Sequence, residues 1–174
     1  MSGSGNAIKT FVKKGVTYNE ATRELVDCLF CRIHRREEPG RVAYEDDDFV
    51  VFHTIAPVTD LHLLVTTREH IKNVSALKGS KGAELVSRLV SIGKIALGDR
   101  ADKAQYSFHI PPANSIDHLH LHAIASPETM SWKSYLKYNT NVWWSQSSDA
   151  VIHKLRSEQR ALDEAEAAAP KDRM

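Results

Sequence analysis

The chain lacks most of the features that would place it in a specialised class of protein. Its 174 residues include only two cysteines, which are too few for a disulfide scaffold. It has no apolar run of the roughly 20 residues that a membrane-spanning helix needs, and its net charge of +1 gives no reason to expect nucleic acid or an anionic membrane as a partner. We therefore expect a protein of a reducing compartment, the cytoplasm or also the nucleus, that binds neither nucleic acid nor a membrane.

The amino-acid composition is that of an ordinary globular domain. Hydrophobic residues make up 42% of the chain and charged residues 26%, which is typical of such domains. The start of the chain is rich in Gly, Ser, Asn and Lys, so we expect residues 1–22 to form a flexible tail. The domain with its C-terminal extension is then assigned to residues 23–157, and a fraying helix and tail to residues 158–174.

Hydrophobic patterning predicts five strands and two main helices. The stretch RVAYEDDDFVVFHTI indicates a hairpin around an acidic turn, and LHLLVTT indicates a third strand. QYSFHI and IDHLHLHAIA are typical of two further strands, whereas residues 80–98 carry Leu85, Leu89 and Ala96 at helical spacing. A last helix is expected to begin near Ser148. Strands on both sides of one long helix predict an α+β fold with a mainly antiparallel five-stranded sheet, one main helix and a C-terminal helix.

Three alternating histidines in DHLHLHAIA, His118, His120 and His122, are the most unusual feature of the sequence. Side chains alternate between the two faces of a strand, so these three share one face while Leu119 and Leu121 occupy the core face. Three imidazoles rarely fill a core, because each buried ring nitrogen needs a partner. The spacing alone leaves open a chance polar face, a zinc site with a position for water, or attack of one imidazole on phosphorus while its neighbours stabilise the phosphate oxygens.

A resemblance to a known family narrows these interpretations. HLHLHAI resembles the His-x-His-x-His-x-x signature of the histidine triad (HIT) family, in which x is apolar. The stretch from DCLFCRIHRREEPG to VTTREHI is similar to the N-terminal half of that family, and FHIPPANSIDHLHLH and DAVIHKLR resemble the longer eukaryotic members of its HINT branch. The resemblance implies a HIT-like fold and a purine nucleotide of the AMP type as substrate.

The resemblance also implies a covalent mechanism. The family's nucleophile is the middle histidine, here His120, which would attack the α-phosphorus of a nucleoside 5′-phosphoramidate. His122 and His62 would flank the phosphate, donating to its oxygens or carrying protons, and water would then release the nucleoside monophosphate. No redox cofactor is needed. The positions that match the family's substrate contacts are Phe30, Ile33, Phe52 and Ile55 for the base, Thr54 for the ribose, and Asn114 and Ser115 for the phosphate or leaving group.

A metal site is expected beside the triad. Cys28 and Cys31, in CLFC, have the spacing of half a tetrahedral zinc site, although a pair of reduced thiols is the alternative. Family members that keep both cysteines use them with two histidines, which here match His70 and His118. The resemblance therefore implies a structural zinc ion. It also implies a homodimer built around the main helix and a central strand.

Three features depart from the family pattern: Thr54, the stretch VTTREH in place of the family's more usual proline-lysine turn, and a shorter loop around HIPPANS. The first of them keeps other functions open. Related proteins commonly carry Asp where this chain has Thr54, and a charged acceptor makes the stronger hydrogen bond to ribose hydroxyls. We therefore expect a weaker hold on ribose or an altered nucleotide preference. The alternatives to a phosphoramidase are a hydrolase of dinucleoside polyphosphates or adenylyl sulfate, a nucleotide-binding regulatory module with little turnover, and a hydrolase that uses the triad as metal ligands.

Overall fold

The computed structural model describes residues 8–168. The strands are β1 (Thr10–Lys13), β2 (Val16–Asn19), β3 (Leu25–Cys28), β4 (Val42–Glu45), β5 (Phe49–His53), β6 (His62–Thr67), β7 (Gln105–His109), β8 (His120–Ile124) and β9 (Ser145–Ser147). The helices are α1 (Leu29–His34), α2 (Gly79–Leu97), α3 (Trp132–Tyr138) and α4 (Ser148–Ala168). Short 3₁₀ turns cover Val74–Ala76, Gly98–Lys103 and Pro127–Thr129.

The central feature is an antiparallel sheet with the strand order β4-β5-β6-β8-β7-β9. The α+β class and the five expected strands are confirmed, and the sheet gains a sixth strand, β9. This strand pairs with the outer edge of β7, with Ser147 opposite Ser107. The sequence could not indicate β9, because three polar residues carry no hydrophobic alternation.

The two faces of the sheet have different uses. Leu119, Leu121 and Ala123 lie in the main core with α2, whereas Phe52 and Leu64 pack with α1 on the other side. The helix α2 approaches the sheet closely, because a Cβ at position 93 would lie 3.3 Å from side-chain atoms of Tyr106 and Val65. A side chain in place of Gly93 would press on both neighbours. The histidines lie on the face of the sheet opposite α2.

Residues 10–19, which the sequence placed in a flexible tail, form strands β1 and β2 of a three-stranded sheet with β3. Val16 is fully buried, and the turn between the strands uses positive φ at Lys14 and Gly15. Val16 packs in an apolar cluster with Phe30 and Phe52, a long-range contact that local composition does not report. Residues 1–7 of the expected tail lie outside the described residues.

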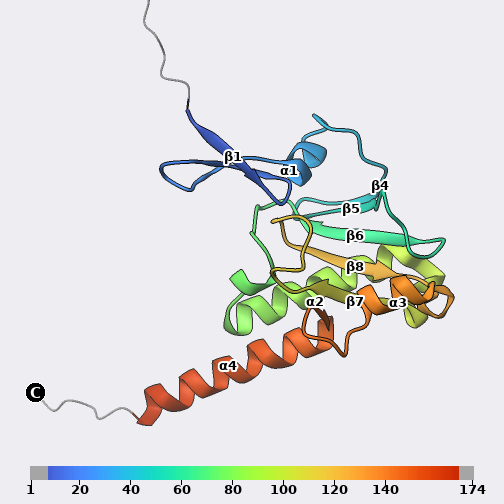
Figure 1. Ribbon diagram of the computed structural model, residues 1–174. Coiled ribbons are helices and arrows are strands. Elements are labelled where there is room, and N and C mark those ends of the chain that lie inside the picture. Colours follow the sequence, from blue (N-terminus) through green and yellow to red (C-terminus); the bar gives the residue numbers. More distant parts are fainter. Residues whose placement is uncertain (1–7, 169–174) are drawn as a thin grey trace, which may run out of the picture.

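The C-terminal helix begins at Ser148 as expected and continues to Ala168, past the predicted end of the domain. Figure 1 shows it running alongside α2, at the opposite end of the molecule from β1, and Val151 and Leu155 join the main core. Residues 169–174 lie outside the described part of the chain. Among the helices within residues 8–168, none combines the length and apolar character that a membrane span requires.

Candidate functional site

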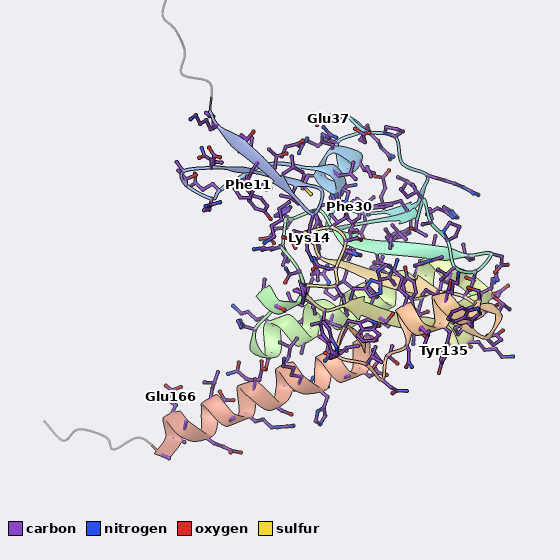
Figure 2. The ribbon with its side chains drawn as sticks, viewed as in Figure 1. Phe11, Lys14, Phe30, Glu37, Tyr135 and Glu166 are labelled. Atoms are coloured by element: carbon purple, nitrogen blue, oxygen red, sulfur yellow. The ribbon has the colours of Figure 1, made fainter. Side chains whose placement is uncertain are left out.

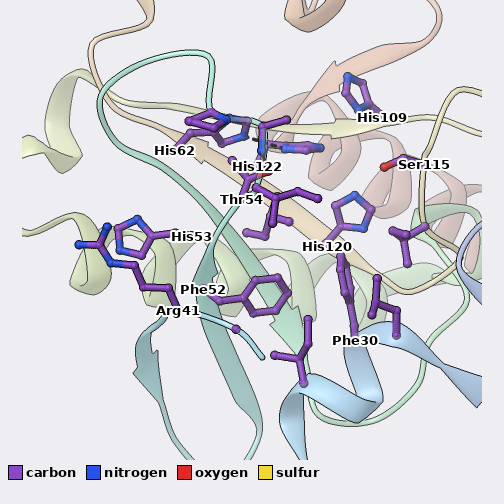
Figure 3. A pocket seen from close by; sticks show the side chains of 18 of the residues that line it. Phe30, Arg41, Phe52, His53, Thr54, His62, His109, Ser115, His120 and His122 are labelled. Atoms are coloured by element: carbon purple, nitrogen blue, oxygen red, sulfur yellow. Dashed lines mark hydrogen bonds between the residues drawn. The ribbon is translucent and has the colours of Figure 1, made fainter. Parts of the chain in front are cut away.

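A cavity of about 860 Å³ opens on the histidine face of the sheet. Its walls come from α1, the end of β5, β6, β8, the loop before β8 and the end of α3 (Figure 3). The volume falls within the range of small-molecule sites, which is about 300–1,000 Å³. Most predicted site residues line it, namely Phe30, Ile33, Phe52, Thr54, Ile55, His62, Ser115, His120 and His122.

The hydrogen bonds of His120 determine which of its nitrogens can react. Its Nδ1 lies 2.6 Å from the backbone oxygen of His118. A carbonyl oxygen only accepts, so Nδ1 must carry the proton and Nε2 keeps its lone pair. Nε2 makes no hydrogen bond to any residue between 8 and 168, and the ring lines the cavity. The site therefore presents one imidazole lone pair to a ligand.

His122 and His62 form a second imidazole pair beside it. His62 Nε2 lies 2.9 Å from His122 Nδ1, and both side chains are about 95% buried or more. His122 Nε2 and His62 Nδ1 are buried without a partner in the described part of the chain. Orphaned buried nitrogens are costly, so a bound polar ligand would satisfy His122 at the point where it faces the cavity.

Burial keeps these rings neutral. Loss of hydration lowers the pKa of His120 and of His62 to about 4, and lowers the pKa of His122 well below its usual value. Neighbouring cationic groups, among them Lys137, lower the pKa of His62 and His122 further. A neutral imidazole is the form that can act as a nucleophile or as a neutral hydrogen-bond donor.

The apolar slot expected for a base lies at the other end of the cavity. Phe30, Ile33 and Phe52 line it and are buried, with the Phe30 and Phe52 rings 5.0 Å apart in an edge-to-face arrangement. Ile55 also lines the cavity, but its side chain is fully exposed. Thr54 lies between this slot and the histidines, as Figure 3 shows.

Asn114 differs from its expected place. It does not line the cavity, and its amide is fully used: Oδ1 accepts from Lys14 Nζ at 2.7 Å, while Nδ2 donates to Ile116 O and to Asp117 Oδ1. Its role is to hold the loop that carries Ser115, which does line the cavity. Both N–H groups of this buried amide are engaged within the protein and the residue lies outside the cavity lining, and sequence position alone does not reveal those partners.

Lys14 is one residue whose part in the site the sequence did not show. Its Nζ also donates to the backbone oxygens of Asn114, at 2.7 Å, and Pro112, so it ties the turn between β1 and β2 to the loop before β8. Figure 2 shows it between the N-terminal strands and the body of the molecule. Two adjacent lysines in a sequence are ordinarily solvated charges, so the pattern carries no signal for this role.

The end of α3 is the other unexpected part of the wall. Lys137 and Tyr138 line the cavity, and the Tyr138 ring lies 5.1 Å from the ring of His122. His109, to which the sequence assigned no role, also lines the cavity, with its ring 4.8 Å from that of His122. Because α3 comes from a stretch without clear periodicity, only tertiary packing places it here.

Four metal-ligating side chains meet on the other side of His118. One ligand atom from each of Cys28, Cys31, His70 and His118 lies within 4.8 Å of the other three. Cys28 Sγ and His118 Nδ1 are 3.5 Å apart, as are Cys31 Sγ and His70 Nδ1, and Cys31 Sγ is 3.6 Å from His118 Nδ1. Zinc bonds of about 2.3 Å to sulfur and 2.0–2.1 Å to nitrogen at the tetrahedral angle require about 3.5 Å between such atoms.

The protonation of this cluster also suits a cation. His118 Nε2 donates to the backbone oxygen of Thr67 at 2.8 Å, which leaves the Nδ1 lone pair facing the sulfurs. A hydrogen bond from the Cys31 thiol lowers the pKa of Cys28 and so favours a thiolate. The residues present therefore fit a metal ion of the zinc type.

Comparison with known proteins identifies the family. Residues 27–137 match the family model described as scavenger mRNA decapping enzyme C-term binding. The chain is 30% identical to adenosine 5′-monophosphoramidase HINT3 of Xenopus tropicalis, over 82% of this chain and 96% of that relative. It is also 36% identical to the bifunctional adenosine 5′-phosphosulfate phosphorylase/adenylylsulfatase HINT4 of Arabidopsis thaliana, over 65% and 79% of the two chains. The chain belongs to the HINT branch of the histidine triad family.

Solved structures agree with this membership and confirm the HIT-like fold. This HINT-branch protein superposes on a HIT family hydrolase from Clostridium thermocellum with a TM-score of 0.53 and 25% identity, over 59% of this chain and 93% of the other. A Zn-bound histidine triad family protein from Mycobacterium smegmatis shares the fold with a TM-score of 0.51 and 22% identity, over 80% and 97%.

Proposed function

We propose that this HINT-branch protein hydrolyses adenosine 5′-phosphoramidates through a nucleotidyl–histidine intermediate. The observation that carries the proposal is the lone pair of His120 Nε2, which the bond from Nδ1 to the His118 carbonyl fixes and which faces a cavity of nucleotide size. The HINT3 relatives are named adenosine 5′-monophosphoramidases, which supports the same substrate class. A regulatory module with little turnover would not need a nucleophile held in one tautomer.

In the first step, His120 Nε2 attacks the α-phosphorus, and a phosphorus–nitrogen bond to His120 forms while the bond to the leaving amine breaks. The electron pair of the broken bond stays on the amine, which takes a proton as it leaves. His122 is placed to supply that proton or to donate to a phosphate oxygen: with His62 Nε2 donating to its Nδ1, its own Nε2 carries hydrogen toward the cavity.

In the second step, water attacks the phosphorus of the intermediate and restores His120 with its lone pair. The Nδ1 bond to the His118 carbonyl holds the ring in place through both steps, so the same nitrogen leaves that earlier attacked. The apolar slot of Phe30, Ile33 and Phe52 would hold the base, and Ser115 lies where it can contact the phosphate or the leaving group. Water is excluded from the slot by the same apolar side chains.

Zinc at Cys28, Cys31, His70 and His118 is the second part of the proposal. A closed site with four protein ligands has no position for substrate, so its contribution is structural. It would tie β3 and α1 to the strand that carries His120. A reducing compartment such as the cytoplasm would keep both thiols available for the ion.

The homodimer remains a prediction, and the fold limits the surfaces that it could use. The outer edge of β7 is paired with β9, and α4 packs against α2. We infer that a second copy would meet the remaining exposed side of α2, where Ile95 is 60% exposed. Light scattering of the purified chain should give twice the monomer mass, and Ile95→Lys should restore the monomer; a monomeric wild type would contradict this inference.

The proposed activity can be tested by trapping the intermediate. The full chain is mixed with adenosine 5′-phosphoramidate, quenched in acid-free denaturant within the first turnover, and weighed by mass spectrometry. An adenylate adduct should appear on the wild type, disappear with time and be absent from His120→Ala. Turnover without any adduct, or an adduct that persists in His120→Ala, would overturn the assignment of the nucleophile.

A further inference from the structure

The C-terminal end of α3 is held over the histidines by two hydrogen bonds from β7. Gln105 Nε2 donates to the backbone oxygen of Tyr138 at 2.9 Å, and His109 Nε2 lies 3.3 Å from the backbone oxygen of Lys137. The rings of Tyr138 and His62 are 5.4 Å apart in an edge-to-face contact. The position of Lys137 relative to the reacting groups is therefore set by the core of the domain, although its side chain is exposed.

Lys137 brings a positive charge to this end of the cavity. Its Nζ lies 5.3 Å from the centre of the Tyr138 ring, which in turn touches His122. Its ammonium group has no ion pair or hydrogen bond with any residue in the described range 8–168, although its backbone oxygen accepts from His109. Asp60, the carboxylate that lines the same cavity, is already bound by Arg100 at 2.6 Å. The charge of Lys137 is thus available to a ligand.

The neighbouring histidines indicate what the positive charge of Lys137 can do. His62 and His122 are kept neutral by burial, so these two imidazoles bring no cation to the phosphate. His122 Nε2, buried and without a partner in the described chain, points to where a polar group of the ligand must lie. The ring of His122 lies 5.1 Å from that of His120 and 5.1 Å from that of Tyr138, and the Tyr138 ring in turn lies 5.3 Å from Lys137 Nζ.

We propose that Lys137 determines leaving-group specificity, favouring substrates in which the nucleotide carries an anionic oxyacid, with sulfate as the representative, over those that release an amine. This inference rests on the proposed nucleotidyl transfer to His120. The cation would lie beside the group that departs, whereas the apolar slot at the opposite end holds the base.

The chemistry of the two kinds of leaving group differs in what it requires. With adenosine 5′-phosphosulfate, His120 Nε2 forms the bond to the α-phosphorus, the phosphorus–oxygen bond to sulfate breaks, and the electron pair leaves on sulfate as a second negative charge. No proton is needed, but a nearby cation lowers the energy of the developing charge. With a phosphoramidate, the departing nitrogen takes a proton and leaves as an amine, so the charge of Lys137 gives no such advantage.

The experiment compares two substrates on matched variants. Steady-state kcat/KM is measured for adenosine 5′-phosphosulfate and for adenosine 5′-phosphoramidate with wild type, Lys137→Gln, Lys137→Arg and Lys133→Gln. Lys133 lies on the same helix, over the Trp132 ring, and does not line the cavity, so it is the matched control. Lys137→Gln should lose about tenfold on the phosphosulfate and less than about twofold on the phosphoramidate, as expected for a charge at the rim of a site.

Further outcomes separate this inference from the proposed function. Lys137→Arg should retain most of the phosphosulfate activity, and raising the salt concentration should slow wild type on that substrate more than it slows Lys137→Gln. Equal losses on both substrates, or a wild type that cleaves the phosphoramidate but not the phosphosulfate, would overturn the role of Lys137 and leave the proposed function standing. Failure of wild type on both substrates would instead remove the proposed function.

Discussion

His118 and His120 are two residues apart on the same face of the same stretch of chain, yet they have opposite tautomers. His118 donates from Nε2 to Thr67 O and turns Nδ1 toward two sulfurs. His120 donates from Nδ1 to His118 O and leaves Nε2 open to the cavity. In both cases a backbone carbonyl, which can only accept, decides which nitrogen keeps its lone pair.

The difference shows that residue type and position on one face of a strand do not by themselves determine the function of a histidine. His118 is fully buried in a closed group with Cys28, Cys31 and His70, so its lone pair can serve only an ion of fixed position. His120 borders an open cavity, so its lone pair can meet successive ligands. Closed coordination suits a structural role, whereas an open position suits chemistry.

The largest expected effect comes from replacing His120, and this variant tests the contrast with His118 most directly. His120→Gln removes the lone pair at the cavity but preserves a side chain that can donate to the His118 carbonyl. We expect kcat on adenosine 5′-phosphoramidate to fall by at least about 10⁴-fold, or roughly 5.5 kcal/mol in the barrier, as in the loss of other nucleophiles. The measurement is single-turnover release of AMP.

The matched variant for that test is His118→Gln. It should lower metal content and the thermal midpoint, whereas His120→Gln should leave both near the wild-type value. If His118→Gln lost activity without losing metal, or if His120→Gln lost the metal, the division between the closed and open groups would be wrong.

The next largest effect is expected from removing the ion. Cys28→Ser should abolish stoichiometric zinc binding, which elemental analysis of the purified chain would show as about one equivalent in wild type and none in the variant. A ligand present at about 1,000 times its Kd stabilises the native state by ~4 kcal/mol, so denaturant unfolding should show a loss of that order.

A chelator should lower the stability of wild type alone, and adduct formation on His120 should survive chelation while the chain stays folded. Loss of activity at once on chelation, with the fold intact, would favour the metal-hydrolase alternative.

A smaller effect is expected from pH, through His62. Burial lowers its pKa from 6.5 to about 4, so between these two values the unfolded chain binds a proton that the native chain does not. Stability should therefore be greatest above pH 6.5 and fall as the pH is lowered toward 4, by an amount of the order of 3 kcal/mol for this group. His62→Gln removes the titrating ring, so its unfolding free energy should change less over that interval. If the unfolding free energy of the variant changed with pH as steeply as that of wild type, His62 would not be the cause of the pH dependence.

Much of this arrangement could be predicted because it depends on periodicity. The two-residue period of β8 places His120 and His122 on one face, and the 3.6-residue period of α2 assigns that helix to the other. The resemblance added His62 and the metal-ligating residues, which lie far apart in the sequence.

What could not be predicted depends on long-range contacts between segments of weak pattern. Lys14 reaches a loop 100 positions away, and α3 covers the histidines only because Gln105 and His109 bind its last turn. Asn114 was placed at the substrate for the same reason: the three partners that occupy its amide come from tertiary packing, not from its neighbours in the pattern.

The smallest expected effect comes from Thr54, which lines the open cavity with His120 and has no part in the closed metal-ligating group. Thr54 lines the cavity with a neutral hydroxyl that already accepts from the backbone N–H of Ala56 at 3.3 Å, so one lone pair of an uncharged oxygen is left to accept from ribose. Thr54→Asp supplies a charged acceptor, and the Kd for AMP measured by calorimetry should fall about five- to tenfold, or ~1 kcal/mol. The Kd for 2′,3′-dideoxy-AMP should not fall, because that ligand has no ribose hydroxyls to donate. Zinc content and the thermal midpoint should also stay unchanged, since the closed group lies on the other side of His118. An equal gain for both nucleotides would mean that the carboxylate acts on something other than ribose.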